Sequence, residues 1–208
     1  GGFAEQAVTD ERQVFRLAAN VDYVTAAAVP VAYGTSHLGL WYKAGLRPGE
    51  WLLVHGAAGG VGLTAVEVAK LMDARVIATA SSPEKREIAR AAGADRVIDS
   101  AAEDLREQVK DITGGRGVEV VYDPVGGELF DQSLRCTAQG GRILIVGFAS
   151  GTVPRIPANI LLVKNIAAIG FYWGAHLRIA PERMEESCRQ LVDWLASGRL
   201  KPHVSATY

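Results

Sequence analysis

Glycines crowd one short stretch of the sequence, between a run of apolar residues and a segment with helical spacing. Residues 55–62 read His-Gly-Ala-Ala-Gly-Gly-Val-Gly. Glycine lets a backbone turn tightly and approach a ligand without an intervening Cβ, and the N–H groups that begin a helix attract anions. A tight turn without a ligand is the alternative. Between a strand and a helix, however, such a cluster is typical of dinucleotide binding, with the pyrophosphate at the helix N-terminus.

Residues after the next apolar run indicate which dinucleotide fits. NAD enzymes usually place an acid about 20 residues beyond the glycines, where it accepts a hydrogen bond from the ribose 2′-hydroxyl. This sequence has Thr-Ala-Ser-Ser at residues 79–82. Hydroxyls with a nearby cation suit a 2′-phosphate, so we favour NADPH over NADH. Lys85 is the first candidate for that cation and Arg86 the second, while the alternative for Lys85 is a solvated helix residue.

A repeated strand–helix pattern positions these residues. Runs that are apolar throughout, or nearly so, are typical of parallel strands buried on both faces, and they lie at 51–55, 75–79, 96–98, 118–122, 142–146 and 166–171. Helical segments separate them at 62–72, 83–92, 102–112 and 128–136, and Ser82, Pro83 and Gly93 suit the cap, first turn and end of the second helix. We therefore predict an α/β fold with a Rossmann, doubly wound, six-stranded parallel sheet.

Both ends of the chain fall outside this repeat. Residues 1–30 predict strands at 4–8 and 14–17 and a helix around 25–28. Residues 174–208 predict an amphipathic helix at 181–197 and the start of a strand at 200–204; the apolar face of that helix holds Met184, Cys188, Leu191, Val192 and Leu195. Because these pieces need a partner layer, we expect a fragment of a longer subunit, with a central domain at 31–173.

Composition excludes several classes of protein. The formal net charge is −1, so no basic excess favours nucleic acid or anionic lipid. Lys164 and Asn165 interrupt the most apolar stretch, which argues against a membrane span. The chain opens without a signal-peptide pattern, and its two cysteines lack disulfide or metal spacing. We expect a cytoplasmic protein with reduced thiols.

Several further motifs carry a family resemblance, which covers nearly the whole chain. They lie at residues 46–50, 54–62, 78–82, 93–95, 113–117, 122–127, 140–142 and 146–148. With these the chain resembles the medium-chain dehydrogenase/reductase superfamily, and within it the zinc-free quinone oxidoreductase (zeta-crystallin-like) branch. The resemblance implies flanking pieces of a largely absent GroES-like barrel domain, with 1–30 as its tail end and 174–208 as the return segment.

The resemblance also implies roles for individual residues. The pyrophosphate would be held by backbone N–H groups of Gly59, Gly60, Val61 and Gly62. Ser81 and Lys85 would contact the adenosine 2′-phosphate. The nicotinamide would lie beside Thr35, Gly147, Phe148 and Ser150, with residues 171–173 bordering the same end of the cleft.

Two departures from the family pattern concern the cofactor. Ala57 stands at the first glycine of the usual fingerprint, and Ser100 replaces a tyrosine often found near the 2′-phosphate. Zinc-dependent members carry a ligand cysteine before the Rossmann domain, whereas residues 31–35 read Val-Ala-Tyr-Gly-Thr. We therefore expect no catalytic zinc. His55 is expected to be a hydrogen-bonded core residue, and His37 to lie on a helix surface.

The expected reaction is hydride transfer from NADPH to a quinone or an α,β-unsaturated carbonyl compound. Tyr33 is a catalytic candidate by position only, and packing at the domain junction is its alternative role. A short-chain dehydrogenase is disfavoured because the Tyr-x-x-x-Lys pair is missing. The remaining alternative is a non-catalytic NADPH-binding module, crystallin-like or RNA-associated. Pairing of the exposed edge strand at 165–171 predicts a homodimer.

Overall fold

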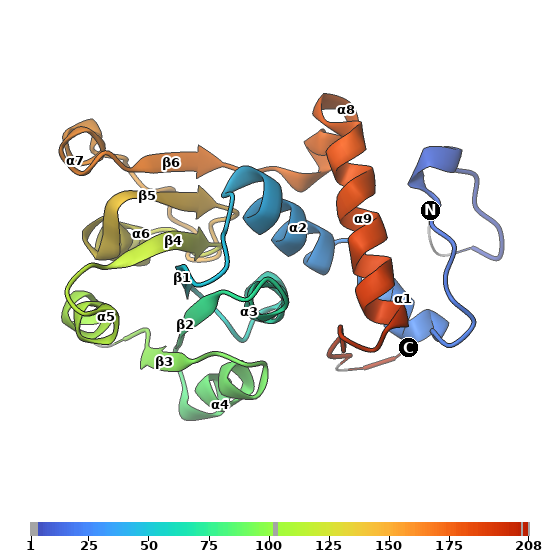
Figure 1. Ribbon diagram of the computed structural model, residues 1–208, viewed down its shortest axis with the longest axis horizontal. Helices are drawn as coiled ribbons and strands as arrows, with labels where there is room; N and C mark the ends of the chain where they lie inside the picture. The colour runs from blue at the N-terminus through green and yellow to red at the C-terminus, as the bar shows by residue number, and fades with distance from the viewer. Residues whose placement is uncertain (1–3, 102–103, 205, 208) are drawn as a thin grey trace.

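A six-stranded parallel sheet organises the protein (Figure 1). The computed structural model describes residues 4–101, 104–204 and 206–207. Within this part the strand order is β3-β2-β1-β4-β5-β6, which is the doubly wound Rossmann order. The strands are β1 (Trp51–Val54), β2 (Arg75–Ala80), β3 (Arg96–Asp99), β4 (Val118–Asp123), β5 (Thr137–Ile145) and β6 (Ala167–Gly170). The predicted fold class is confirmed.

Helices cover both faces of the sheet, which explains the uniformly apolar strands. The connecting helices are α3 (Gly60–Leu71), α4 (Pro83–Ala91), α5 (Leu105–Thr113), α6 (Glu128–Cys136) and α7 (Ala158–Lys164). Leu52 and Val54 of β1 join a core cluster with α3 and α4, whereas Leu53 between them joins a second cluster with α5 and α6. Successive side chains of one strand are thus buried on opposite faces.

Local capping signals act where the sequence indicated them. The Ser82 side chain accepts a hydrogen bond from the Lys85 amide at the start of α4. Asp104, which was not predicted as a cap, accepts from the Glu107 amide at the start of α5. Gly93 follows α4 with φ +106°, a conformation that glycine adopts readily. Helix α5 begins at Leu105, later than the expected residue 102; residues 102 and 103 lie outside the described part.

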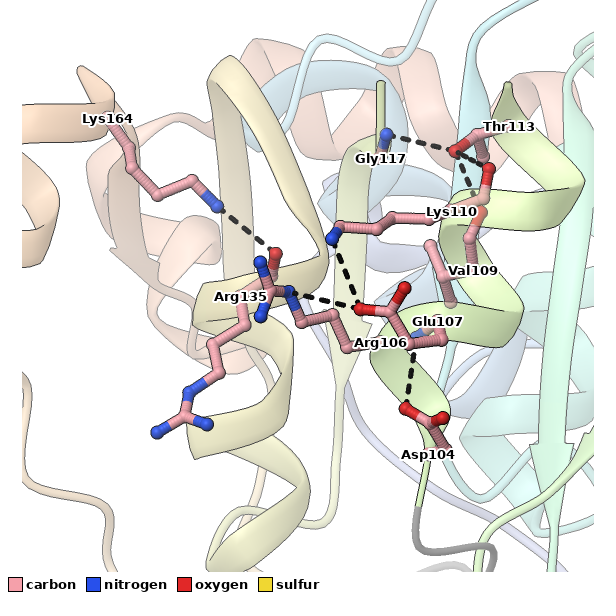
Figure 2. A network of polar contacts seen from close by, with 9 residues as sticks. All are labelled: Asp104, Arg106, Glu107, Val109, Lys110, Thr113, Gly117, Arg135 and Lys164. Atoms are coloured by element: carbon pink, nitrogen blue, oxygen red, sulfur yellow. Dashed lines mark hydrogen bonds and ion pairs between the residues drawn. The ribbon is translucent and has the colours of Figure 1, made fainter. Parts of the chain in front are cut away.

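Polar contacts on the α5–α6 face support the framework (Figure 2). Glu107 forms ion pairs with Arg106 and Lys110, all on α5. The Lys164 ammonium at the end of α7 donates to the carbonyl of Leu134, 2.7 Å away, and so supplies a partner at the C-terminal end of α6. Beside these cations Cys136 is buried, and burial raises the pKa of its thiol to about 11. The Lys164 contact therefore stabilises the end of α6, and burial keeps the thiol protonated despite the nearby cations.

One arginine joins the entrance of β1 to β5. The Arg142 guanidinium donates to the carbonyls of Ala44 and Gly45 and forms a two-point ion pair with Glu50, at 2.6 and 2.9 Å. A further bond reaches the Glu119 carbonyl at 3.3 Å. Both charged side chains are less than one-fifth exposed. The turn before β1 is thereby fixed to a strand that comes much later in sequence.

Outside the repeat, the flanking segments form short helices and irregular chain, and the expected strands are absent from the described residues. The flanking elements are η1 (Glu11–Gln13), α1 (Tyr23–Ala27), α2 (Ala32–Leu38), the π-helical η2 (Gly39–Lys43), η3 (Trp173–Ala175), α8 (His176–Ile179) and α9 (Pro181–Ala196). The expected strands at 14–17 and 200–204 are wrong, and so is the one at 4–8: these segments have no strand partner in the described residues. A single extended segment leaves its backbone groups unpaired, so these segments form no sheet. The N-terminal segment, α1, α9 and the C-terminal segment gather on one side of the sheet (Figure 1).

Helix α9 attaches these flanking pieces through one buried face. Met184, Leu191 and Leu195 are buried as expected, whereas Cys188 and Val192 are partly exposed. Trp194 and Ser187 complete the buried face.

Among the helices of the described residues, none combines the length and the apolar character that a membrane span requires.

Candidate functional site

The glycine-rich loop folds back onto the first turn of α3. Gly56 has φ +57°, and the Gly59 amide donates to its carbonyl at 2.9 Å. A Cβ on Gly62 would lie 2.2 Å from that same carbonyl oxygen. No side chain can therefore occupy position 62 without moving the loop. The Ala57 amide donates to the Thr79 carbonyl at 3.0 Å, which fastens the loop to the end of β2.

The start of α3 offers unpaired backbone donors to an anion. The amides of Gly60, Val61 and Gly62 lie in the first helical turn, where N–H groups have no intrahelical acceptor. Within the described residues no side chain caps this helix, and its first turn contains no acid. Space in the direction of a Gly60 Cβ is empty to 4 Å. These features fit the pyrophosphate of a dinucleotide.

Loops after β1, β4 and β5 are locked together at one end of the sheet. Asp123 at the end of β4 accepts hydrogen bonds from the amides of Val125 and Gly126, at 2.8 and 2.9 Å. Val125 in turn packs where a Cβ of Gly56 would point, at 3.2 Å, so the loop after β4 contacts the glycine loop. Strand order reverses between β1 and β4, and the crevice outside such a switch point is where ligands bind in doubly wound sheets.

Three residues expected beside the nicotinamide lie in the loop after β5. A Cβ on Gly147 would approach the Pro124 carbonyl at 3.2 Å, and the Ser150 hydroxyl lies 3.0 Å from the corresponding position on Gly127. Phe148 is 43% exposed. The structure therefore brings this loop against the loop after β4.

Helix α2 carries Thr35 and a buried polar anchor. The hydroxyl of Ser36 hydrogen-bonds to Thr64 on α3 at 2.7 Å and to the Tyr122 hydroxyl on β4 at 3.2 Å. This network fixes Thr35, which is itself buried, relative to α3 and the sheet. Sequence reasoning missed both Ser36 and Asp123. The signal for Asp123 was a carboxylate that directly follows an apolar strand.

Beyond the end of β2, the residues expected to bind the 2′-phosphate are exposed. Ser81 follows β2, and Lys85 lies in the first turn of α4. Lys85 forms no ion pair within the described part of the chain. Arg86, the second candidate, instead pairs with Asp99 at 2.7 Å.

Tyr33 is enclosed between α2 and α3. Its hydroxyl donates to the Glu67 carboxylate at 2.5 Å, and its side chain is buried. Burial, followed by the neighbouring Glu67, raises the pKa of Tyr33, and burial raises the pKa of Glu67. This placement matches the packing role that was considered for Tyr33.

The buried histidines are part of the framework. His55 hydrogen-bonds to Thr79 at 3.0 Å and to Ser133 at 2.6 Å, as expected for a core residue. The expectation for His37 was wrong: it is 5% exposed and bonded to Ser187 on α9 at 2.8 Å. His37 was expected on a helix surface, but α9 covers that face of α2. In the described residues no group of three His, Cys, Asp or Glu side chains could hold a metal ion.

A cavity of about 710 Å³ lies away from the glycine loop. Its walls come from the segment before α2 and from α9, with apolar residues such as Phe15, Val29, Met184 and Leu191. None of its lining residues belongs to the loops after β1, β4 or β5. It is therefore a feature of the flanking pieces.

Comparisons with known proteins agree with this geometry. A family described as zinc-binding dehydrogenase matches residues 60–197. The quinone oxidoreductase-like protein 2 homolog of Nematostella vectensis is 41% identical over 100% of this chain and 57% of its own length. Quinone oxidoreductase-like protein 2 of Bos taurus is 39% identical over 100% of the chain and 60% of its own length.

Solved structures show the same fold. Quinone oxidoreductase from Pseudomonas syringae pv. tomato DC3000 superposes with a TM-score of 0.84 and 36% identity, covering 92% of this chain and 59% of that protein. Escherichia coli quinone oxidoreductase complexed with NADPH gives a TM-score of 0.83 and 35% identity, covering 91% and 58%. This chain thus spans less than two thirds of the relatives that it matches. With its doubly wound sheet, glycine loop and family match, the chain belongs to the medium-chain dehydrogenase/reductase superfamily, in the quinone oxidoreductase-like branch.

Proposed function

We propose that the chain is the NADPH-binding part of an oxidoreductase that transfers a hydride to a quinone or an α,β-unsaturated carbonyl compound. One observation carries this proposal: the loop closes so tightly that Gly62 excludes any Cβ, while the amides of the first turn of α3 remain without intrahelical partners. Support also comes from relatives named quinone oxidoreductase and from a mycobacterial and an Escherichia coli structure that are described as complexed with NADPH.

Individual residues have distinct tasks in this proposal. Amides of residues 60–62 hold the diphosphate, whereas the Gly59 amide, expected to share this task, is engaged by the Gly56 carbonyl and shapes the loop. Ser81 and Lys85 bind the adenosine 2′-phosphate. Thr35, with the loop that carries Gly147, Phe148 and Ser150, borders the nicotinamide. Bound NADPH would supply the hydride chemistry. The protein holds these loops in place through the buried contacts of Ser36 and Asp123.

A nucleotide titration tests the proposal. NADPH and NADH are titrated against the wild-type chain and against Lys85→Ala, with binding followed by the fluorescence of the reduced nicotinamide. We expect NADPH to bind more tightly, and Lys85→Ala to weaken NADPH about tenfold while NADH changes less. Lys110→Ala on α5 is the matched control and should leave both affinities unchanged. Equal wild-type affinities would refute the cofactor choice, and the absence of saturable binding of either nucleotide would refute the function.

Turnover separates an enzyme from a binding module. The full-length subunit is assayed with NADPH and a panel of quinones and enones, and oxidation of the nucleotide is followed by absorbance. Acceptor-dependent oxidation supports the oxidoreductase. Tight NADPH binding without turnover of any acceptor would favour the non-catalytic module.

The edge of the sheet supports a further part of the proposal, a homodimer. Strand β6 ends the strand order and is partly exposed, and Leu162 and Val163 on the preceding α7 are more than 70% exposed. Open strand edges favour pairing with a second copy. Light scattering of the dilute protein should give the mass of a dimer, and a monomer mass would refute this arrangement.

A further inference from the structure

An ion pair links the ends of β2 and β3, beside the proposed phosphate site. The Arg86 guanidinium lies 2.7 Å from Oδ2 of Asp99, and the same nitrogen lies 3.5 Å from the carbonyl of Ala80. Oδ1 of Asp99 accepts a hydrogen bond from the Ala101 amide at 3.0 Å. The two charged side chains are 23% and 43% exposed, so water and ligands can reach both. The pair is thus anchored by the backbone at each end.

This pair lies next to the residues proposed to bind the 2′-phosphate. Ala80 and Asp99 are register partners in adjacent strands, and Ser81 directly follows Ala80. Arg86 follows Lys85 on α4, one residue after the amide that Ser82 caps. The inference below rests on the proposed function, because it concerns the affinity for NADPH.

The charged side chains around the Arg86–Asp99 pair balance one another. Lys85 and Arg86 are the cations, and Glu84 and Asp99 are the acids. The hydrogen bond from Ala101 and the charge of Arg86 lower the pKa of Asp99, so its carboxylate is ionised at neutral pH. A guanidinium binds carboxylate and phosphate with the same planar geometry. A 2′-phosphate therefore has to compete with Asp99 for Arg86, whereas NADH carries no phosphate at that position.

We propose that the Arg86–Asp99 ion pair sets how strongly the chain prefers NADPH over NADH. Arg86 is a further specificity-determining residue beside Lys85, and Asp99 limits the preference by competing with the 2′-phosphate for the Arg86 guanidinium.

A double-mutant cycle tests the competition. The ratio of the NADH and NADPH dissociation constants is measured by fluorescence for wild type, Asp99→Asn, Arg86→Gln and the double variant. We expect Asp99→Asn to raise the ratio about fivefold and Arg86→Gln to lower it about fivefold, the upper range for one exposed charge pair. The double variant should match Arg86→Gln within about twofold, because the competitor matters only when Arg86 is present. Glu107→Gln, which breaks an exposed ion pair on α5, is the control.

Thermal melts check that each variant is folded, and Asp99→Ser replaces Asp99→Asn if the latter melts early. An unchanged ratio in both Asp99 variants would overturn the proposal. An equal rise in the Arg86→Gln background would also overturn it, because Asp99 would then repel the phosphate directly. Failure of the wild type to bind either nucleotide would instead refute the proposed function.

Discussion

Protonation of His37 should weaken the attachment of α9 to α2. The imidazole is hydrogen-bonded to Ser187, stacks on Trp41 with ring centroids 5.8 Å apart and meets the edge of Trp194 at 5.1 Å. Burial lowers the pKa of His37 to about 4, while the charge of Glu186 acts weakly in the opposite direction. The folded protein thus holds this group neutral far below the usual histidine range.

The pKa difference sets the size of the effect. An unfolded histidine has a pKa near 6.5, and each pKa unit equals about 1.36 kcal/mol. Because the unfolded state binds the proton first, stability is full above about pH 6.5 and falls as the pH decreases toward 4. The loss reaches about 2 kcal/mol at pH 5 and about 3.4 kcal/mol below pH 4.

Urea unfolding of wild type and His37→Asn measures this loss. Asparagine keeps a polar group near Ser187 and cannot be charged. Between pH 7.5 and 5 the wild type should lose about 2 kcal/mol more of its free energy of unfolding than the variant. Between pH 7.5 and 9 the two should respond alike. His55, whose pKa burial also lowers, contributes equally to both proteins. Parallel curves down to pH 5 would refute the reasoning.

Substitutions at three other positions, Gly62, Tyr33 and Arg142, test the framework around the site, with Gly60→Ala as a control. Gly62→Ala should lower the free energy of unfolding by about 2–4 kcal/mol because its methyl meets the Gly56 carbonyl, whereas Gly60→Ala, with empty space around it, should not destabilise; equal urea midpoints would contradict this. Tyr33→Phe should cost about 1–3 kcal/mol by leaving the half-buried Glu67 without its donor, and should leave the NADPH dissociation constant unchanged. A change in that constant in the folded variant would restore Tyr33 as a site residue. Arg142→Ala should cost about 3–5 kcal/mol in chemical denaturation because Glu50 and two carbonyls lose their partner; a cost below about 1 kcal/mol would show that water replaces the guanidinium.

Most of the sheet could be predicted because its signals are local. Each strand is a short apolar run between glycines or helix caps. The Ser82 side chain caps α4 and the Gly93 backbone turns after it, as these residue types indicate. The parallel arrangement of the strands was predicted because their apolar runs indicated burial on both faces. The glycine loop could also be predicted from sequence alone, because its features lie within eight consecutive residues.

The rest depends on contacts between distant residues. His37 and Ser187 are 150 positions apart, so nothing near residue 37 shows that α9 covers it. Ser36 acts through Thr64 and Tyr122, and Arg86 is engaged by Asp99. The expected strands at the ends failed because strand formation requires a partner, which those segments lack within the described residues.

The bonds made by Arg142 have a consequence for synthesis on the ribosome. Its guanidinium supplies partners for groups that are 92 to 98 residues earlier in the chain, at Ala44, Gly45 and Glu50. A nascent chain that has not yet reached position 142 cannot form these contacts at the entrance of β1, although the glycine loop has already been translated. The turn that leads into β1 therefore remains incompletely anchored until the fifth strand emerges from the exit tunnel.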